Sequence, residues 1–429
     1  MKKPKVAIVG AGLAGLSAAV YLYDEADVTI FEAGQVAGGR TRTLPKRGQN
    51  QFLGEIDNGQ HIIIGAYQSL LCLLKQVGVQ ETEVFLRLPL TWYIYNGLKM
   101  RCGRLPAPLN LFFAVLCSQG ITIKDKYALF KSLYSLKKYQ GKDNTVQRWL
   151  NHQKVPYSVQ HDFWQPMVLS ALNTPLEQAS IHTLLKVIND GVLSSQKSSD
   201  LLLPKKTLDE VFIQPILTFL HEKKVRVCLG SRVKSIQSAC HGQVLIDDQL
   251  FDSVILATAP YHAVHLIEDK DIQAKINQLQ YSAICSVYLY YNQQISLPYP
   301  MVGVKDGTVD WLFDRGALGH SSNEVAAVVS CAQLEQNHGQ LVKNVHQDVL
   351  KFCPYLQEPV EYQVIIEKRA TFLSNVLRPK IDGRQLTQKQ IYLAGDYMHS
   401  FYPATLEGAV QSGQKAAAQC LLDWKQCHE

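Results

Sequence analysis

Short apolar runs alternate with a longer helical pattern at the start of the chain. Lys5 to Val9 is a β-branched run that ends at Gly10, and Leu13 to Asp24 is rich in alanine and leucine. DVTIFEA, from Asp27 to Ala33, then has the composition of a second buried strand. Short apolar runs next to turn residues favour strands, whereas longer runs of good helix formers favour a helix. The pattern therefore predicts a βαβ unit with a glycine turn.

Later segments have the composition of further strands, although they lie far along the chain. DSVILA (Asp252 to Ala257) and QIYLA (Gln390 to Ala394) are typical of central strands in an α/β sheet. Ser286 to Tyr291 and Val325 to Ser330 are also strand-like, and Leu109 to about Tyr139 is helical. We therefore expect a discontinuous α/β nucleotide-binding domain, with a second domain inserted in two pieces.

Length and charge narrow the classes of function. The chain has 429 residues, of which 47% are apolar and 19% charged, so it is long enough for two folded domains. Its formal charge of +6 is modest, and no Lys/Arg run is interleaved with aromatic residues, so no nucleic acid partner is expected. The ten cysteines contain no C-x-x-C pair, which predicts reduced thiols and no metal site.

The N-terminus imitates a signal peptide, because Lys2, Lys3 and Lys5 precede an apolar run. Glycines at dinucleotide-binding spacing explain the same residues better. The longest apolar stretches elsewhere, such as Leu109 to Cys117, are shorter than the roughly 20 residues of a membrane-spanning helix. We expect a cytoplasmic protein without a transmembrane anchor, with a peripheral position on the inner face of the membrane as the alternative.

Three glycines near the N-terminus are the first residues that indicate a binding site. Gly10, Gly12 and Gly15 form G-x-G-x-x-G between the predicted strand and helix. In this motif the first glycine makes the tight turn, the second admits a pyrophosphate and the third lets the helix pack on the strand. Leu13 and Ala14, at the start of the helix, offer free N–H groups to the phosphates.

A carboxylate at the end of the second strand strengthens this interpretation. Glu32 stands where an acidic side chain accepts both ribose hydroxyls of an adenosine. It would repel a 2′-phosphate, so NADP is not expected here. The alternative is a glycine turn and a loop carboxylate without any ligand.

Gly38, Gly39 and Arg40 distinguish FAD from NAD. Two glycines and an arginine form a loop that can place a guanidinium on a pyrophosphate. In its order after Glu32, the tripeptide resembles the GG-R signature of the flavoprotein group that holds amine oxidases, protoporphyrinogen oxidases and carotenoid desaturases. The resemblance implies FAD as the cofactor.

The C-terminal segment from Ala394 to Ala417 resembles the flavin motif of the same group. The resemblance implies that Gly395 ends a strand and that Asp396 bonds the ribityl or phosphate side of the flavin; a simple cap is the alternative for Asp396. The next helix is expected to begin near Ala404 to Leu406, so that Thr405 and Leu406 place its positive end towards the flavin. Val233 matches the position whose backbone meets the adenine edge, although its run also fits an ordinary edge strand.

Four stretches resemble a narrower family, the squalene-associated FAD-dependent desaturases that act as hydroxysqualene dehydroxylases. They are DNGQHIIIGAY (Asp57 to Tyr67), SALNTPLEQAS (Ser170 to Ser180), SSDLLLPKKTLDEVF (Ser198 to Phe212) and YPATLEGAVQSG (Tyr402 to Gly413). The resemblance implies hydride transfer from reduced FAD to a hydroxylated C30 isoprenoid, loss of water and formation of squalene for hopanoid synthesis. An allylic cation on that path needs shelter from water, which predicts a long apolar tunnel.

Two residues are candidates for the acid that this chemistry needs. His61 follows a turn that the wider group places near the flavin ring, and an imidazole titrates near neutral pH. Tyr402, just before the C-terminal helix, is the other candidate. For each residue the alternative is a purely structural hydrogen bond.

The complete prediction is an α/β fold: a Rossmann-like FAD-binding domain with an inserted α+β substrate domain, as in amine oxidases and phytoene desaturases. Residues 1–60, 200–262 and 385–429 are assigned to the FAD domain, and residues 61–199 and 263–384 to the substrate domain. Expected partners are a hydrophobic isoprenoid substrate, an unidentified reductant for the flavin and, through the helices from Leu109 to Tyr139, a membrane surface. The alternative functions are a carotenoid (phytoene-type) desaturase, another amine oxidase-like flavoenzyme and a lipid-binding escort protein.

Overall fold

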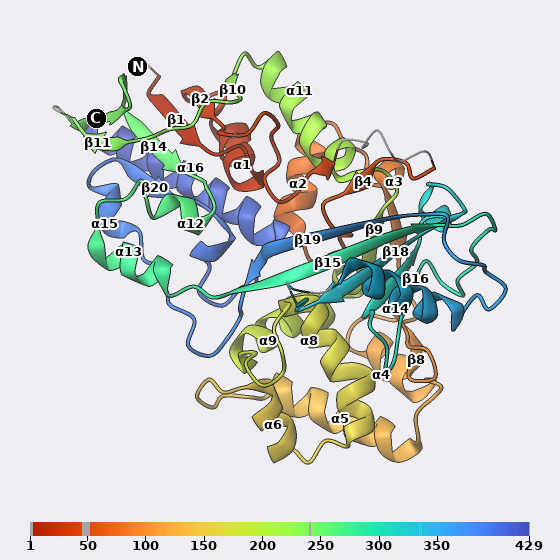
Figure 1. Cartoon of the computed structure of the whole chain (residues 1–429). Helices are drawn as coiled ribbons and strands as arrows, with labels where there is room; N and C mark the ends of the chain where they lie inside the picture. The colour runs from red at the N-terminus through yellow and green to blue at the C-terminus, as the bar shows by residue number, and fades with distance from the viewer. Residues whose placement is uncertain (1–2, 45–51, 240–241, 334, 336, 429) are drawn as a thin grey trace.

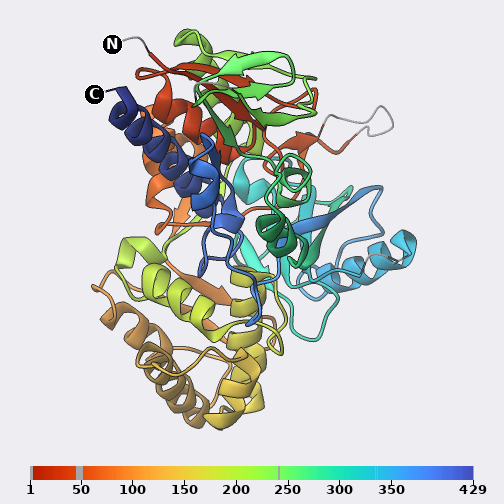
Figure 2. The same ribbon diagram turned by 90° about the vertical axis from the view of Figure 1, so that its left-hand side faces the viewer.

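Two five-stranded sheets and a group of helices form the framework of the protein (Figure 1). The computed structural model describes residues 3–44, 52–239, 242–333, 335 and 337–428. Both chain termini lie at the end of the molecule that holds the first sheet, and the helices between β8 (Lys99–Arg101) and β9 (Leu201–Pro204) form the opposite end (Figure 2).

The first sheet contains the predicted βαβ unit. Its core is β1 (Lys5–Val9), α1 (Leu13–Leu22) and β2 (Asp27–Phe31), with β1 and β2 parallel. All five strands are parallel, and their spatial order is β10 (Arg226–Cys228), β2, β1, β14 (Ser253–Leu256) and β20 (Ile391–Leu393). The two distant apolar runs are therefore strands of this same sheet. β14 is a central strand, as predicted, whereas β20 lies at an edge of the sheet, so the prediction of a central strand is wrong for Gln390 to Ala394.

Helices cover one face of this sheet closely. The C-terminal helix α16 (Leu406–His428) lies against α1, and α2 (Gln68–Gln76) and α11 (Gln214–Glu222) share the same core. Gly413 permits this approach, since a Cβ there would stand 2.0 Å from the carbonyl oxygen of Ala14. The opposite face packs against α13 (Lys270–Asn277) and the antiparallel sheet β11–β12–β13 (Ile236–Ser238, Val244–Ile246, Gln249–Phe251).

The second sheet is antiparallel and connects the two ends of the molecule. Its spatial order is β16 (Met301–Gly303), β17 (Trp311–Asp314), β18 (Glu324–Ser330), β15 (Tyr281–Tyr290) and β19 (Glu361–Phe372). Helix α14 (His338–Leu350) covers one side of it. The long antiparallel strands β15 and β19 lie side by side and cross the middle of the molecule, between the first sheet and the helical end (Figure 1).

The predicted helical stretch after Leu109 is two helices rather than one. Helix α4 (Leu109–Leu116) ends before Gly120, which has a φ of 81°, and α5 (Ile123–Lys137) begins behind a capping box made by Thr122 and Asp125. Helices α6 (Val146–His152), α8 (Gln165–Leu172) and α9 (Ile181–Val187) complete this end. Among the described residues, no helix is both long and apolar enough to cross a membrane.

A small sheet lies where the predicted domains meet. It consists of β5 (Ile63–Ile64), β9 and β6 (Phe85–Leu88). Part of this region packs into the core of the first sheet, namely Ile63, Phe85 and the apolar side of α2. These residues follow the boundary predicted at residue 60 and were assigned to the substrate domain. The domain limits themselves stay a prediction.

Candidate active site

In the glycine turn after β1, two of the three glycines leave no space for a side chain, whereas the third has open space beside it. Gly10 has a φ of 108°, and a Cβ there would meet the carbonyl oxygen of Ala257 at 2.8 Å. A Cβ on Gly15 would lie 2.0 Å from the carbonyl oxygen of Gly10. Gly12, the N-cap of α1, would place a Cβ in open space. Leu13 and Ala14 follow in the first turn, where amides lack intrahelical partners.

Glu32 joins the end of β2 to this turn. Its two carboxylate oxygens accept hydrogen bonds from the backbone N–H groups of Ala11, at 2.8 Å, and Gly34, at 2.7 Å. The side chain stays partly exposed, and each oxygen retains a lone pair. This geometry suits acceptance of ribose hydroxyls, the role that the sequence predicted.

The loop with Gly38, Gly39 and Arg40 lies directly on the glycine turn. The N–H of Gly38 donates to the carbonyl of Ala11 at 2.8 Å, and Gly38 bridges to Gly12. Gly38 and Gly39 have φ values of 108° and 60°, a region that disfavours other residues. Segments some 25 residues apart in sequence thus form one cradle.

Arg40 pairs with the C-terminal segment. Its Nη2 lies 2.7 Å from Oδ2 of Asp396, and its Nη1 donates to the carbonyl of Ala370 on β19 at 2.9 Å. Burial acts to lower the pKa of Arg40, but the nearby Asp396 carboxylate outweighs it, so the pKa is raised. The sequence predicted a pyrophosphate contact for Arg40, which stays a prediction; the ion pair with Asp396 was not foreseen.

The C-terminal motif is arranged around Gly395. Its φ is 152°, and a Cβ would lie 2.3 Å from the ring of Tyr397. Helix α16 begins at Leu406, inside the expected range. Thr405 Oγ1 accepts from the N–H of Gly408 at 3.0 Å, which makes Thr405 the cap of this helix.

Val233 lies in the irregular segment between β10 and β11, so it is not part of an edge strand. Its side chain is buried, and within the described residues neither its N–H nor its C=O has a hydrogen-bond partner. The N–H of Ser231, two residues earlier, donates to the carbonyl of Glu32 at 2.7 Å. The backbone of Val233 is thus held beside the predicted adenosine site with both polar groups available.

His61 is held as a neutral imidazole. Its Nδ1 lies 2.8 Å from the carbonyl oxygen of Gly59, so Nδ1 carries the proton and Nε2 is an acceptor. Burial lowers the pKa of His61, and the positive charge of Arg40 lowers it further, although the bond to Gly59 opposes this shift. In this state His61 can orient a hydroxyl group but is poorly suited to donate a proton.

Tyr402 is held in its protonated form. Its hydroxyl donates to Oδ2 of Asp190 at 3.2 Å, and Lys186 Nζ lies 2.9 Å from the same oxygen. Burial and the Asp190 carboxylate raise the pKa of Tyr402 above its usual value. Tyr402 and His61 share no hydrogen bond with each other among the described residues.

Several contributors were missed by the sequence analysis. Asn58 Nδ2 donates to Glu367 on β19 at 3.1 Å and contacts the carbonyl of Arg40 at 3.4 Å. Arg378 donates to the carbonyl of Tyr402 at 2.7 Å and also to that of His399, which fixes the loop before α16. Burial lowers the pKa of Arg378 to about 10. Asn58 belongs to a stretch that already stood out, whereas nothing local marks Arg378.

Glu407 was also missed, although it joins two helices. It is almost fully buried, and its carboxylate accepts from the N–H groups of Ser69, at 3.0 Å, and Leu70, at 2.9 Å, in the first turn of α2. An acceptor is favourable there because first-turn amides lack intrahelical partners and the helix dipole attracts negative charge.

Buried polar atoms without partners test whether a polar cofactor fits this cradle. Thr258 Oγ1, Gln60 Oε1, Ser286 Oγ and the Tyr397 hydroxyl have no hydrogen-bond partner within the described residues. Each lies next to a residue already placed: Thr258 by Gly10, Gln60 by His61, Ser286 by Gly59 and Tyr397 by Gly395. Buried polar groups are normally satisfied, so this arrangement fits a bound group rich in donors and acceptors.

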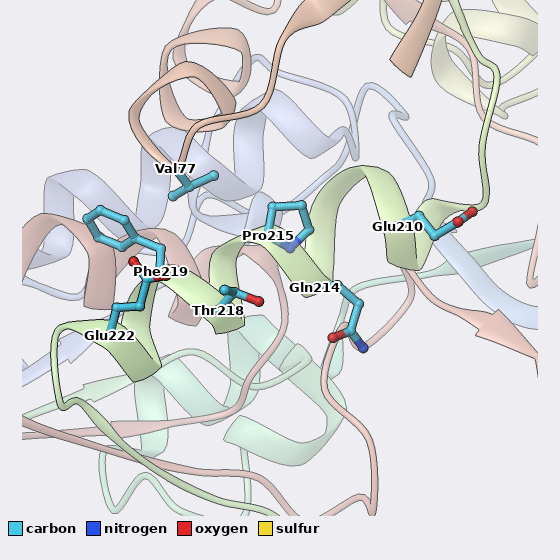
Figure 3. Close-up of a pocket in the computed structure, with 7 residues that line it drawn as sticks. All are labelled: Val77, Glu210, Gln214, Pro215, Thr218, Phe219 and Glu222. Atoms are coloured by element: carbon cyan, nitrogen blue, oxygen red, sulfur yellow. The ribbon is translucent and has the colours of Figure 1, made fainter. Parts of the chain in front are cut away.

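A surface hollow of about 360 Å³ lies elsewhere, along α11 (Figure 3). Val77 and Glu210 border it, and the remaining lining residues come from α11. It contains none of the predicted site residues. The expected apolar tunnel for the substrate stays a prediction.

Relatives of known function match nearly the whole chain. The hydroxysqualene dehydroxylase of Zymomonas mobilis is 29% identical over 430 residues and covers 96% of this chain and 97% of its own. The hydroxysqualene dehydroxylase of Rhodopseudomonas palustris is 27% identical, with coverages of 96% and 97%. The 15-cis-phytoene desaturase of an Oncidium hybrid is 24% identical and covers 99% of this chain and 79% of its own.

Solved structures share the fold. A protoporphyrinogen oxidase homologue from Exiguobacterium superposes with a TM-score of 0.69 at 18% identity, over 99% of this chain and 100% of that one. Cyclohexylamine oxidase from Brevibacterium oxydans gives 0.70 at 17% identity, with the same coverages. The family model for flavin containing amine oxidoreductase matches residues 13–421. Together with the cradle of glycines, Glu32 and Asp396, this places the chain in the flavin-containing amine oxidoreductase family, as an FAD-dependent oxidoreductase.

Proposed function

We propose that this oxidoreductase removes the hydroxyl group of hydroxysqualene and releases squalene and water. The observation that carries the proposal is the similarity to hydroxysqualene dehydroxylases over 96% of the chain, at up to 29% identity. Two of the stretches that carry the narrower resemblance are Asp57–Tyr67 and Tyr402–Gly413. Glu407 of the second accepts hydrogen bonds from Ser69 and Leu70, which closely follow the first, so these parts of the chain lie close together. When bound in its reduced form, FAD supplies the hydride that replaces the departing hydroxyl group.

The protein residues supply polarity and proton control around that exchange. His61, with Nδ1 committed to Gly59, offers Nε2 as an acceptor that can orient the substrate hydroxyl. Departure of the hydroxyl as water requires a proton, and Tyr402 retains its proton across the neutral range. The Tyr402 hydroxyl donates to Asp190, which in turn pairs with Lys186. Tyr402, once its hydroxyl proton turns from Asp190 to the substrate, is our preferred proton donor, and His61 is our preferred orienting residue.

The test begins with photoreduced protein in the absence of oxygen. Hydroxysqualene is added, the flavin absorbance is followed, and products are identified by mass spectrometry. Reoxidation of the flavin with a matching amount of squalene supports the proposal. A flavin that stays reduced beside intact hydroxysqualene contradicts it.

Single substitutions then test the two residue roles. Tyr402→Phe is expected to slow the single-turnover rate by about 10²-fold or more, the lower range of general acid–base contributions. His61→Ala is expected to slow it by about 10²-fold, the scale of a misplaced reacting group. The exposed Tyr355→Phe serves as the matched tyrosine control, and His152→Ala as the histidine control. If both site variants retain FAD and near-normal turnover, both assignments are withdrawn.

A phytoene-type desaturase is the second candidate. The observation in its favour is that the Oncidium desaturase matches 99% of this chain. Desaturation runs in the opposite redox direction, so oxidised flavin should become reduced when phytoene is added. Reduction by phytoene without turnover of hydroxysqualene would select this candidate.

A further inference from the structure

Helix α4 is apolar on the face that points to solvent as well as on the face that is packed. Leu109, Phe112, Phe113 and Leu116 recur at helical spacing, and each side chain is exposed by 46–50%. Its inner positions, among them Leu111 and Val115, are buried. Asn110, which is buried, is the one polar residue of this helix. A helix that is apolar on nearly every side normally lies inside a core or in lipid, so this one is unusual at a protein surface.

The neighbouring helix α5 extends the same surface. The ring of Phe112 lies 4.9 Å from that of Phe130, so α4 and α5 are packed side by side. Ile123 is 84% exposed, and Tyr127 and Tyr134, which follow it on one side of α5, are 69% and 60% exposed. We call this surface the α4–α5 face. Its members are Leu105, Leu109, Phe112, Phe113, Leu116, Ile123, Tyr127 and Tyr134.

The charge of this region is strongly one-sided. From Lys99 to Lys142 the chain has nine lysines and arginines and one acidic residue, Asp125, which gives +8 against +6 for all 429 residues. Asp125 is buried in the capping box with Thr122. Asp143, the next acid, accepts hydrogen bonds from Ser180. The positive charge of the protein is thus concentrated around its exposed apolar helices.

The α4–α5 face lies at one end of the molecule, where a large surface can approach it. Helices α4 and α5 lie at the end remote from both termini and from the first sheet (Figures 1 and 2). Lys124 and Lys131 are exposed on α5 between the apolar positions. Apolar side chains that can enter the acyl boundary, next to lysines that can reach anionic headgroups, are typical of interfacial helices.

We propose that the α4–α5 face docks the protein on the surface of an anionic lipid bilayer. Charge complementarity favours this occupant over a second copy of the chain, because a symmetric contact would oppose two surfaces of the same positive sign. Docking does not depend on the proposed reaction, so the two are tested separately. It places the protein at the phase in which a C30 hydrocarbon dissolves.

Vesicle sedimentation with the full-length flavoprotein tests the docking. Vesicles of phosphatidylcholine that contain phosphatidylserine are compared with vesicles of phosphatidylcholine alone, and we expect binding to the first to be stronger. Raising the salt from about 0.1 M to about 1 M shortens the Debye length from ~10 Å to ~3 Å and should remove most of that difference.

Two variants separate the apolar and the electrostatic contributions. Phe112→Ser/Phe113→Ser should weaken binding by at least about tenfold per residue at any salt concentration. Lys124→Glu/Lys131→Glu should weaken it by at least about 25-fold at low salt only, from about fivefold per basic residue. The matched controls are Leu250→Ser/Leu422→Ser and Lys270→Glu/Lys343→Glu, which change exposed residues elsewhere.

Folding is checked separately, because Phe112 also packs on Phe130. Ile123→Ser, at the most exposed member of the face, should weaken vesicle binding while leaving the melting temperature unchanged. Three results would overturn the proposal: no binding to anionic vesicles, equal losses in the control variants, or a dimer in solution that Ile123→Ser and Phe112→Ser/Phe113→Ser convert to a monomer.

Discussion

Replacing Gly12 by alanine should separate cofactor binding from folding. Gly12 has φ −77° and ψ 175°, which any residue adopts, and an added Cβ would meet no atom within 4 Å. Alanine is a poorer N-cap than glycine, but it also reduces the entropy of the unfolded chain by about 0.4–1 kcal/mol. These effects oppose each other, so the free energy of unfolding of the FAD-free protein should stay within about 1 kcal/mol of the wild-type value.

The same methyl group should obstruct FAD. It would project where the motif requires the backbone to approach a pyrophosphate, and overpacking of that kind costs about 1–3 kcal/mol. The dissociation constant of FAD should therefore rise by roughly five- to 150-fold. FAD-free protein is titrated with FAD by fluorescence, and its thermal unfolding is recorded in parallel.

Gly15→Ala is the matched contrast. Its Cβ would lie 2.0 Å from the carbonyl oxygen of Gly10, a distance that forces the backbone apart. This variant should lose stability even without FAD, by several kcal/mol in order of magnitude. Wild-type affinity for FAD in Gly12→Ala would refute the placement of the pyrophosphate at the open side of this turn.

Three further outcomes follow from the buried charges. Glu407→Ala leaves two first-turn amides of α2 without their acceptor and should lower the free energy of unfolding in urea by about 2–5 kcal/mol, with a smaller loss for Glu407→Gln. Burial raises the pKa of Asp57 to about 6, so its protonated form favours the folded state; stability should fall as pH rises from about 4 to about 6, and Asp57→Asn should remove that slope. Because the pKa of His61 is lowered, the single-turnover rate should stay flat above about pH 7 and change only in acid, and a steep change between pH 7 and 8 would contradict the neutral imidazole.

The βαβ unit at the start of the chain could be predicted because its elements are neighbours in the sequence. β1, α1 and β2 follow one another within 27 residues, so the composition of each run and the glycines between them specify the unit. β14 and β20 could be predicted as strands, because each is buried on both faces and therefore almost wholly apolar. Their order in the sheet depends on chain crossings that no local pattern records.

The sequence pattern could not predict very short strands or contacts between residues that are far apart in the chain. β10 has only three residues, and its place beside β2 becomes clear only when Glu32 and Cys228 are seen to share a backbone hydrogen bond. Arg378 acts through two carbonyl groups of a loop more than 20 residues away. The pair Tyr402 and Asp190 joins positions 212 apart, and Asp190 lies in a π-helical turn that sequence does not announce.

The charged groups around the candidate site explain why the resemblance named two candidates for the acid but could not decide between them. Arg40 and Asp396 neutralise each other, Glu407 is satisfied by two amides, and His61 is uncharged. In the proposed reaction, a proton for the leaving hydroxyl has to come from a group that still holds one near pH 7. Tyr402 meets this condition, and its bond to Asp190 connects it to a partly exposed carboxylate and thence to solvent. Whether Tyr402 can act as the donor in the proposed reaction therefore depends on the side chains that the fold brings against it, such as Asp190, and no sequence pattern shows them.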